Sequence, residues 1–319
     1  MHRIKSIVKK ELSDHFSSFR FIIIFALITM VSLILVYISA VAIDEDLSGE
    51  KIPQFVFLML FTSSRIGLSL VQFVAFFGPL IGLILGFDTI NRERNEGTLS
   101  KLLSQPIYRD DVINGKFLAG LCVITIIMVS IILIITGLGL IVVGVKPGIE
   151  ELWRIIIYLV ICIIYVSLWH GVAILFSILF RSVATSALAS IAAWIFFSFF
   201  LSLGVDTLIS AIVSTKSASS AEVYIKIVKF YKTLSFTSPM KLYVDSTATI
   251  VDPMRRTLRP FIMQMSMMEQ WSLSRFSGPL SIIQSFLMVI PYIIYLMAIT
   301  VICFTISYIV FMRQEIRSL

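Results

Sequence analysis

Six long runs of apolar residues divide the chain, and polar or charged segments separate them. A helix rises about 1.5 Å per residue, so roughly 20 apolar residues cross the hydrocarbon core of a bilayer. The pattern therefore predicts membrane-spanning helices at residues 21–43, 66–87, 117–145, 155–180, 183–205 and 290–312. A further apolar stretch, opened by Pro53 and closed by Arg65, predicts an interfacial or re-entrant piece rather than a seventh span. The predicted fold class is an all-α membrane protein with six transmembrane helices.

Composition agrees with this assignment. Hydrophobic residues make up 58% of the chain, charged residues 14%, and the mean hydropathy is +0.98. The net charge of +7 does not indicate nucleic-acid binding, because the bases flank apolar spans, where topology and lipid headgroups account for them. Each cysteine falls inside a predicted span, which gives no support to a disulfide framework or a metal cluster.

The short loops predict the orientation. Those on the side of both termini contain thirteen Lys and Arg residues, and those on the other side contain four. Bases concentrate on the cytoplasmic side of membrane proteins. We therefore expect a multi-pass protein of the cell membrane with both termini in the cytoplasm.

Four regions follow from these boundaries. Residues 1–20 have apolar positions at three- and four-residue steps between bases, which is typical of an amphipathic helix lying in the headgroup layer. Residues 21–205 hold spans 1–5 and a charged cytoplasmic loop at 88–116. Residues 206–279 form a predicted extracytoplasmic region, and residues 280–319 hold an outer segment, span 6 and a cytoplasmic tail.

The loop at 88–116 is the most densely charged segment, with five acids and five bases. Between Arg92 and Ser104 three leucines follow an i, i+3, i+4 pattern, which predicts a short helix with one narrow apolar stripe: Leu99, Leu102 and Leu103. Pro106 would end this helix. Asp110 or Asp111 could then cap the next helix. The loop thus predicts a helix that offers an apolar face to a partner.

These residues also resemble the signature of the ABC type-2 permeases, which are membrane subunits of ATP-driven exporters. The resemblance rests on the spacing of Glu96-Gly97-Thr98-Leu99, Leu102-Leu103-Ser104, Pro106, Arg109 and Gly115-Lys116. In that family the corresponding loop is a coupling helix, seated in a cleft of a separate ATPase subunit. The resemblance implies ATPase-coupling roles for Arg92, Glu93, Arg94, Glu96, Gly97, Thr98, Leu99, Leu102, Leu103, Ser104, Pro106, Arg109, Gly115 and Lys116. It also makes residues 1–20 similar to the family's connecting helix.

The implied function is that of a permease subunit of an exporter, paired with a second permease, identical or different, and with an ABC ATPase. ATP and Mg would be bound by that ATPase. No cofactor or catalytic site is expected here, since the chain has no Gly-rich loop ending in Gly-Lys-Ser/Thr and no His-Glu-x-x-His helix. An alternative is a mechanical or assembly subunit that uses the ATPase to act on an extracytoplasmic partner docked at 206–279. An ATP-independent secondary transporter is disfavoured, because intramembrane charges and inverted repeats are missing.

Four further features give expectations about packing. Gly78, Gly82 and Gly86 recur every four residues, which predicts a smooth face for close helix approach. Pro291 predicts a break or bend in the last span, with 280–290 at the outer face. His170 in span 4 has two interpretations: a neutral side chain bonded to a neighbouring helix, or a substrate or proton site. The methionines between 254 and 268 suggest an apolar surface more than a copper site.

Overall fold

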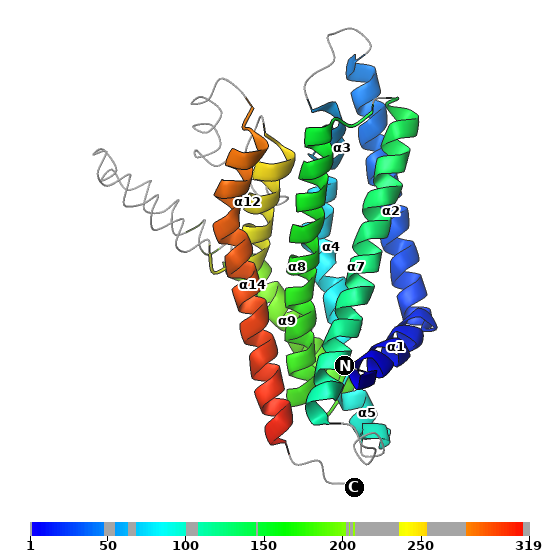
Figure 1. Cartoon of the computed structure of the whole chain (residues 1–319), viewed down its shortest axis with the longest axis vertical. Coiled ribbons are helices and arrows are strands. Elements are labelled where there is room, and N and C mark those ends of the chain that lie inside the picture. The colour runs from blue at the N-terminus through cyan, green and yellow to red at the C-terminus, as the bar shows by residue number, and fades with distance from the viewer. Residues whose placement is uncertain are drawn as a thin grey trace, which may run out of the picture.

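The structure, a computed structural model, describes residues 2–47, 55–62, 68–99, 108–144, 146–201, 204, 207, 236–253 and 279–314. Regular secondary structure in these residues is helical. In chain order the helices are α1 (His2–Phe16), α2 (Phe19–Leu47), α3 (Val56–Thr62), α4 (Leu70–Gly86), α5 (Asn91–Asn95), α7 (Arg109–Val142), α8 (Ile149–Leu179), α9 (Val183–Ile195), the π-helix η1 (Phe196–Phe200), α12 (Pro239–Val251) and α14 (Ile282–Arg313). The long helices lie side by side, with α3 near one end of the bundle and α5 near the other (Figure 1). We refer to these as the α3 end and the α5 end.

The prediction of six spans is confirmed. Among the described residues, six helices are long and apolar enough to cross a membrane: Phe19–Ile43, Leu70–Asn95, Arg109–Val142, Ile149–Leu179, Val183–Phe200 and Ile282–Arg313. Helix α3 has seven residues, about 10 Å of helix, so it cannot be a further span. The chain is therefore a multi-pass membrane protein with an all-helical membrane part.

Helix α14 corrects the expected break in the last span, whereas the alternative of a bend at Pro291 stays a prediction. It runs without interruption from Ile282 to Arg313, with Pro291 inside it. Proline removes one backbone hydrogen bond and crowds the carbonyl four residues earlier, at Leu287. Ending the helix inside a bilayer would leave more backbone groups unsatisfied than the single bond lost at the proline. The continuous helix therefore costs less free energy than a helix that ends at the proline.

Helix α8 is at the centre of the bundle and contacts α4, α7, α9, α12 and α14. Its contact with α4 is close because of the glycines spaced four apart. A Cβ added at Gly82 would lie 2.5 Å from the carbonyl oxygen of Val166, and one at Gly86 would lie 2.9 Å from that of His170. Both distances are shorter than any real Cβ tolerates. The predicted role of these glycines in helix approach is confirmed.

His170 lies in this tight region and is buried. Its Nδ1 is 3.4 Å from the carbonyl oxygen of Gly82 on α4, and its ring stacks on Phe117 with 5.7 Å between centroids. Gly120 on α7 leaves room for the far side of the imidazole. These contacts favour the packing interpretation of His170 over a substrate site.

Helix α12 falls within the 206–279 segment, yet it packs against α4, α8 and α14. The Ser238 hydroxyl accepts from the backbone N–H of Lys241 at its start, and Pro239 opens its first turn. The buried Tyr243 hydroxyl lies 3.3 Å from Tyr158 and its ring stacks on Tyr165 at 4.5 Å. This part of the segment therefore belongs to the helical bundle. Residues 219–222 and the methionines from 254 to 268 lie outside the described residues.

Arg154 secures the α3 end of the bundle. Its side chain is fully buried, and its guanidinium donates to the carbonyl oxygens of Ile250 (2.9 Å) and Leu280 (2.6 Å) and to the Glu150 carboxylate (2.8 Å). Ile250 is in the last turn of α12, where carbonyls lack helical partners and the helix dipole favours a cation. One arginine of α8 therefore holds the end of α12 and the approach to α14.

Candidate functional site

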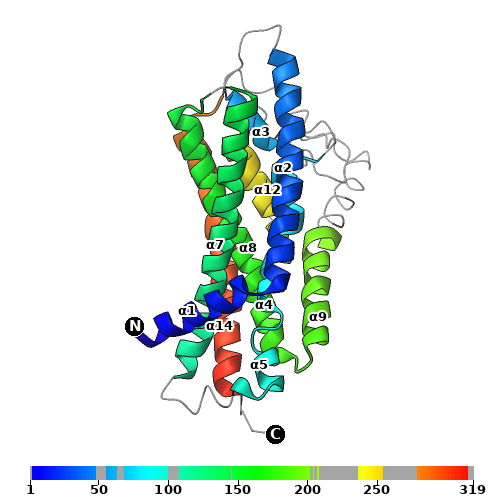
Figure 2. The same ribbon diagram turned by 90° about the vertical axis from the view of Figure 1, so that its right-hand side faces the viewer.

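The predicted coupling loop lies at the α5 end, close to α1 and to the end of α14, as Figure 2 shows. Helix α4 ends at Gly86, a turn follows at 87–90, and α5 begins at Asn91. The charged residues therefore follow directly after the apolar residues of the second span. The description of the loop stops at Leu99 and resumes at Tyr108. Leu102, Leu103, Ser104 and Pro106 lie outside the described residues.

Helix α5 is held at its start by a serine of α8. The backbone N–H groups of Ile90 and Asn91 donate to the Ser177 hydroxyl at 2.9 and 3.2 Å. The Asn91 amide, fully buried, donates to the carbonyl oxygen of Phe87. Sequence reasoning missed both residues. For Ser177 the available signal was a polar side chain in an apolar stretch of sequence, whereas Asn91 lies in a charged loop that gave no such signal.

The expected helix over 92–104 is wrong in one respect, because it breaks at Gly97. Helix α5 ends at Asn95, and Gly97 has a φ of +68°, which L side chains rarely adopt. The N–H of Glu96 returns to the carbonyl of Arg92, and that of Gly97 to the carbonyl of Arg94. This is a common way to end a helix with a left-handed glycine. A Cβ at Gly97 would meet no atom within 4 Å, so backbone conformation explains the glycine within this chain.

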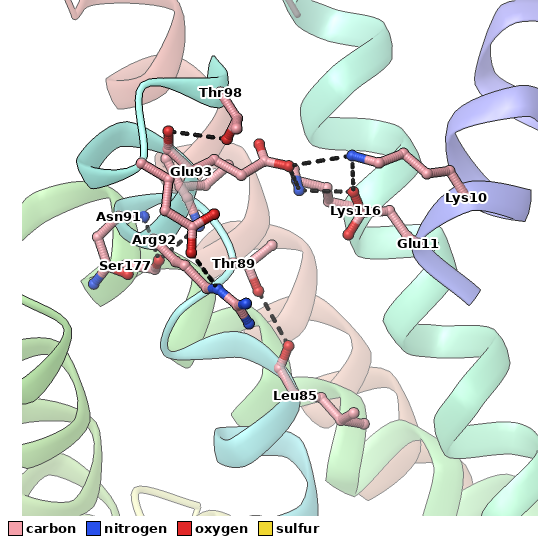
Figure 3. Close-up of polar contacts among 12 residues, drawn as sticks. Lys10, Glu11, Leu85, Thr89, Asn91, Arg92, Glu93, Thr98, Lys116 and Ser177 are labelled. Carbon is pink, nitrogen blue, oxygen red and sulfur yellow. Dashed lines mark hydrogen bonds and ion pairs between the residues drawn. The ribbon is translucent and has the colours of Figure 1, made fainter. Parts of the chain in front are cut away.

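Lys116 connects three helices at the centre of the site (Figure 3). Its ammonium is buried and donates to Glu11 Oε1 on α1 and to Glu93 Oε1 on α5, both at 2.9 Å. A buried ammonium is costly unless it is paired and hydrogen-bonded, and two carboxylates satisfy that requirement here. The ion cluster Glu11–Lys116–Glu93 thus ties α1, α5 and α7 together. Glu11 was not predicted, since nothing local to residues 1–20 distinguishes it.

Gly115 brings α7 against α1 beside this cluster. A Cβ added there would lie 2.7 Å from Ile7 Cγ2, which is shorter than real side chains allow. Gly115 and Lys116 therefore act together: one permits the close approach of α1 and the other bonds to it.

The arginines of the loop connect it to the end of α14. Arg94 donates to the side-chain oxygen of Gln314, and Arg109 donates to its backbone carbonyl at 2.9 Å. The Gln314 amide in turn donates to the carbonyl of Ile178 on α8. Arg92 instead pairs with Glu96 at 2.9 Å on an exposed surface. Gln314 is a further residue that sequence reasoning missed.

Leu99 corrects the expected partner-facing stripe, since only 1% of its surface is exposed. It packs in an apolar cluster formed at the α5 end by several helices, together with Ile7, Ile90, Val112, Ile113, Ile174, Ile178 and Phe311. Its side chain is therefore anchored within the chain. Within the described residues 91–99, the exposed ones are Arg92, Asn95, Glu96, Gly97 and Thr98.

The aspartates before span 3 are also placed differently from the expected cap. Tyr108 occupies the N-cap position of α7 and provides no side-chain cap, whereas Asp110 and Asp111 lie in the first turn. Their charges still lie near the positive end of the helix dipole. Thr98 and Glu93 are joined by a hydrogen bond of 3.2 Å from the Thr98 hydroxyl to the Glu93 carbonyl.

The arrangement contains ion pairs and helix anchors rather than reactive groups. Within the described ranges, no group of three or more His, Cys, Asp or Glu side chains is placed to hold a metal ion. The site has a charged tip, exposed at Arg92 and at Asn95 to Thr98, and hydrogen bonds join it to four helices. Such a tip can receive a partner and transmit its displacement.

Six apolar spans, with a charged loop after the second that is bonded to several helices, define a multi-pass membrane protein. The sequence profile described as ABC-2 family transporter protein matches residues 5–316, so the chain belongs to the ABC-2 transporter family. It is similar to the probable ABC transporter permease protein NosY of Stutzerimonas stutzeri, at 28% identity over 149 residues. That similarity covers 46% of this chain and 50% of the relative, so it spans half the relative's length.

Proposed function

We propose that the chain is the permease subunit of an ATP-driven exporter and that its 88–116 loop couples it to a separate ABC ATPase. The observation that carries the proposal is the buried Glu11–Lys116–Glu93 cluster, which joins the loop to α1 and α7. Family membership supports the transporter class, and the positive-inside rule supports a cytoplasmic α5 end.

In this account the ATPase contacts the exposed residues at the end of α5. Arg92 and Glu96 have 59% and 52% of their side-chain surface exposed, and they pair with each other. Charges at the rim of an interface set register and partner choice more than raw affinity. Leu102 and Leu103 remain proposed as the apolar part of the contact, and Leu99 serves as the internal anchor of the segment.

Three sets of hydrogen bonds would transmit movement of α5 to the spans. Glu93 leads through Lys116 to α7 and α1, Arg94 leads through Gln314 to α14, and the start of α5 is bonded to Ser177 of α8. The bonds of Lys116 and Arg94 are charge-assisted and those to Ser177 are neutral; together they would make a shift of the tip move the helices rather than the side chains alone. ATP binding and hydrolysis take place in the partner, and this chain contributes no catalytic residue.

We further propose that two permease subunits form the transport unit, identical or different. Family resemblance supports a dimer and the export direction. The substrate would then move between the paired spans.

Copurification tests the proposal. The chain is isolated from its native membrane, and the bound ATPase is identified. We expect an Arg92→Glu, Glu96→Arg variant to lose most of the bound ATPase, whereas Lys9→Glu, Lys5→Glu, an exposed double change on α1, retains it. An equal yield of ATPase with both variants would contradict the proposed contact. An outer partner that copurifies in place of any transported substrate would favour the assembly-subunit alternative.

A further inference from the structure

A cavity of about 500 Å³ lies at the α5 end between α1, α2, α4, α5 and α7. Apolar residues of three spans line one part of it: Ile24, Ile81, Ile84 and Ile127. Its charged part, which we call the mouth, includes residues on both sides of the junction between α1 and α2, near Phe19, where the first span begins. The cavity therefore crosses the level at which lipid headgroups meet the hydrocarbon core.

Two cations at the mouth keep donors that no described residue uses. The Lys10 ammonium is 3.7 Å from Glu93 Oε1 and 3.9 Å from Glu11 Oε1, both too long for hydrogen bonds. Arg20 donates through Nη1 to Asp88 at 2.8 Å, and 61% of its side chain is exposed. Together they provide N–H donors of the kind that bind phosphate oxygens.

An acid lies beside them on the same helix face. Asp14 is four residues after Lys10 on α1 and lines the same cavity; its carboxylate interacts electrostatically with Arg92 and His15, and no hydrogen bond to it is found among the described residues. The lining as a whole has five acids (Glu11, Asp14, Asp88, Glu93 and Glu96) and four bases (Lys10, Arg20, Arg92 and Lys116). Burial lowers the pKa of His15, the remaining titratable group, so it adds no positive charge at neutral pH. The mouth therefore disfavours a ligand with net negative charge.

We propose that this cavity binds one phospholipid with a phosphoethanolamine headgroup from the leaflet at the α5 end, which is cytoplasmic in the proposed topology. Lys10 and Arg20 hold the phosphate and Asp14 accepts from the primary ammonium. The first acyl methylenes lie on Ile24, Ile81, Ile84 and Ile127. A quaternary ammonium has no N–H to donate to Asp14, so phosphatidylcholine binds less well, and phosphatidylglycerol is disfavoured by its net charge.

Native mass spectrometry of the purified chain tests this directly, after delipidation and addition of equal amounts of phosphatidylethanolamine, phosphatidylcholine and phosphatidylglycerol. We expect one retained phosphatidylethanolamine. Lys10→Gln with Arg20→Gln should weaken its retention at least about tenfold, since two charge-assisted bonds are lost. Arg20→Lys with Lys10 intact should retain most of it. The matched control Lys9→Gln, on α1 but outside the cavity lining, should leave retention unchanged.

Two further measurements test the headgroup and the acyl chain of the lipid separately. Asp14→Asn should reduce the preference for phosphatidylethanolamine over phosphatidylcholine without abolishing binding. Soluble glycerophosphoethanolamine should fail to displace the lipid, because the apolar part of the cavity holds the acyl chain; displacement at millimolar concentration would overturn the lipid assignment. Equal retention of all three lipids, or retention in the Lys10 and Arg20 variants equal to that of Lys9→Gln, would overturn the site itself. Thermal unfolding of each variant in the same detergent identifies any that lose lipid through misfolding. Ile84→Trp provides a second test, because its larger side chain should fill the cavity and block lipid retention.

Discussion

The Lys116 ammonium and the Glu93 carboxylate lie 2.9 Å apart, and only 2% of the Lys116 side-chain surface and 14% of the Glu93 side-chain surface are exposed. Lys116 is in a membrane span and Glu93 is in the loop that carries the family signature. Removing one member of a buried ion pair leaves the other charge uncompensated, at a cost of about 3–5 kcal/mol. Loss of either side chain should therefore weaken the attachment of the loop to the span.

Gly97 offers a test that separates backbone from side-chain effects. Its positive φ predicts that Gly97→Ala strains the turn by about 1 kcal/mol, whereas Asn tolerates the left-handed region better. Both side chains have space within this chain, since nothing lies within 4 Å of an added Cβ. We expect Gly97→Asn to retain more bound ATPase than Gly97→Ala in copurification. If the larger Asn is instead the more harmful, close approach of the ATPase explains the glycine.

The closeness of α4 and α8 predicts a stability difference between two glycines. Gly82→Ala should destabilise the chain by about 1–3 kcal/mol, because its Cβ would press on the α8 backbone. Gly137→Ala on α7 is the matched control, since no atom lies within 4 Å of its added Cβ. Thermal unfolding of the two variants in one detergent measures the difference. Equal midpoints would show that α4 and α8 are not packed this closely.

Much of this fold follows from the length and spacing of apolar residues. The number of spans follows from the lengths of the apolar runs. The close-packing face of α4 follows from the four-residue spacing of Gly78, Gly82 and Gly86. The ion cluster could not be predicted this way, because Glu11 and Lys116 are 105 positions apart and meet only after α1 folds against α7. Apolar spacing also placed Leu99 on one face of a helix, but it did not show whether that face packs within this chain or against a partner protein. The continuity of α14 through Pro291 depends on the bilayer, since the cost of ending a helix in lipid is not a property of the local sequence.

The hydrogen bonds of Arg154 predict that this side chain holds the C-terminal end of α12 to the bundle. Arg154→Gln cannot donate to Ile250, Leu280 and Glu150 together, so the last turn of α12 should loosen and the chain should be destabilised by about 3 kcal/mol or more. Arg154→Lys should be almost as harmful, because a single ammonium does not reproduce the forked guanidinium. Limited proteolysis at residues 236–253 measures the loosening. Cleavage at the wild-type rate in both variants would exclude this role.

The proposed topology predicts opposite labelling of two cysteine variants. Glu96→Cys should react only with a reagent that enters the cytoplasm, whereas Ser219→Cys should already react with a membrane-impermeant reagent added to intact cells. The reason is the excess of bases in the loops on the Glu96 side. Labelling of Ser219→Cys from the cytoplasmic side alone would require a different order of spans.

The most direct test of the account follows a conformational signal from the ATPase to the opposite end of the bundle. Lys146→Cys places a reactive group at the α3 end, in a background in which Cys122, Cys162 and Cys303 are replaced by alanine or serine. Its labelling rate is measured in the reconstituted permease–ATPase complex, with and without ATP, in the presence and absence of Lys116→Met. We predict that ATP changes the rate when Lys116 is present, and that Lys116→Met abolishes this change while the ATPase stays bound and active. An equal ATP-dependent change in both proteins would contradict transmission through the Glu11–Lys116–Glu93 cluster.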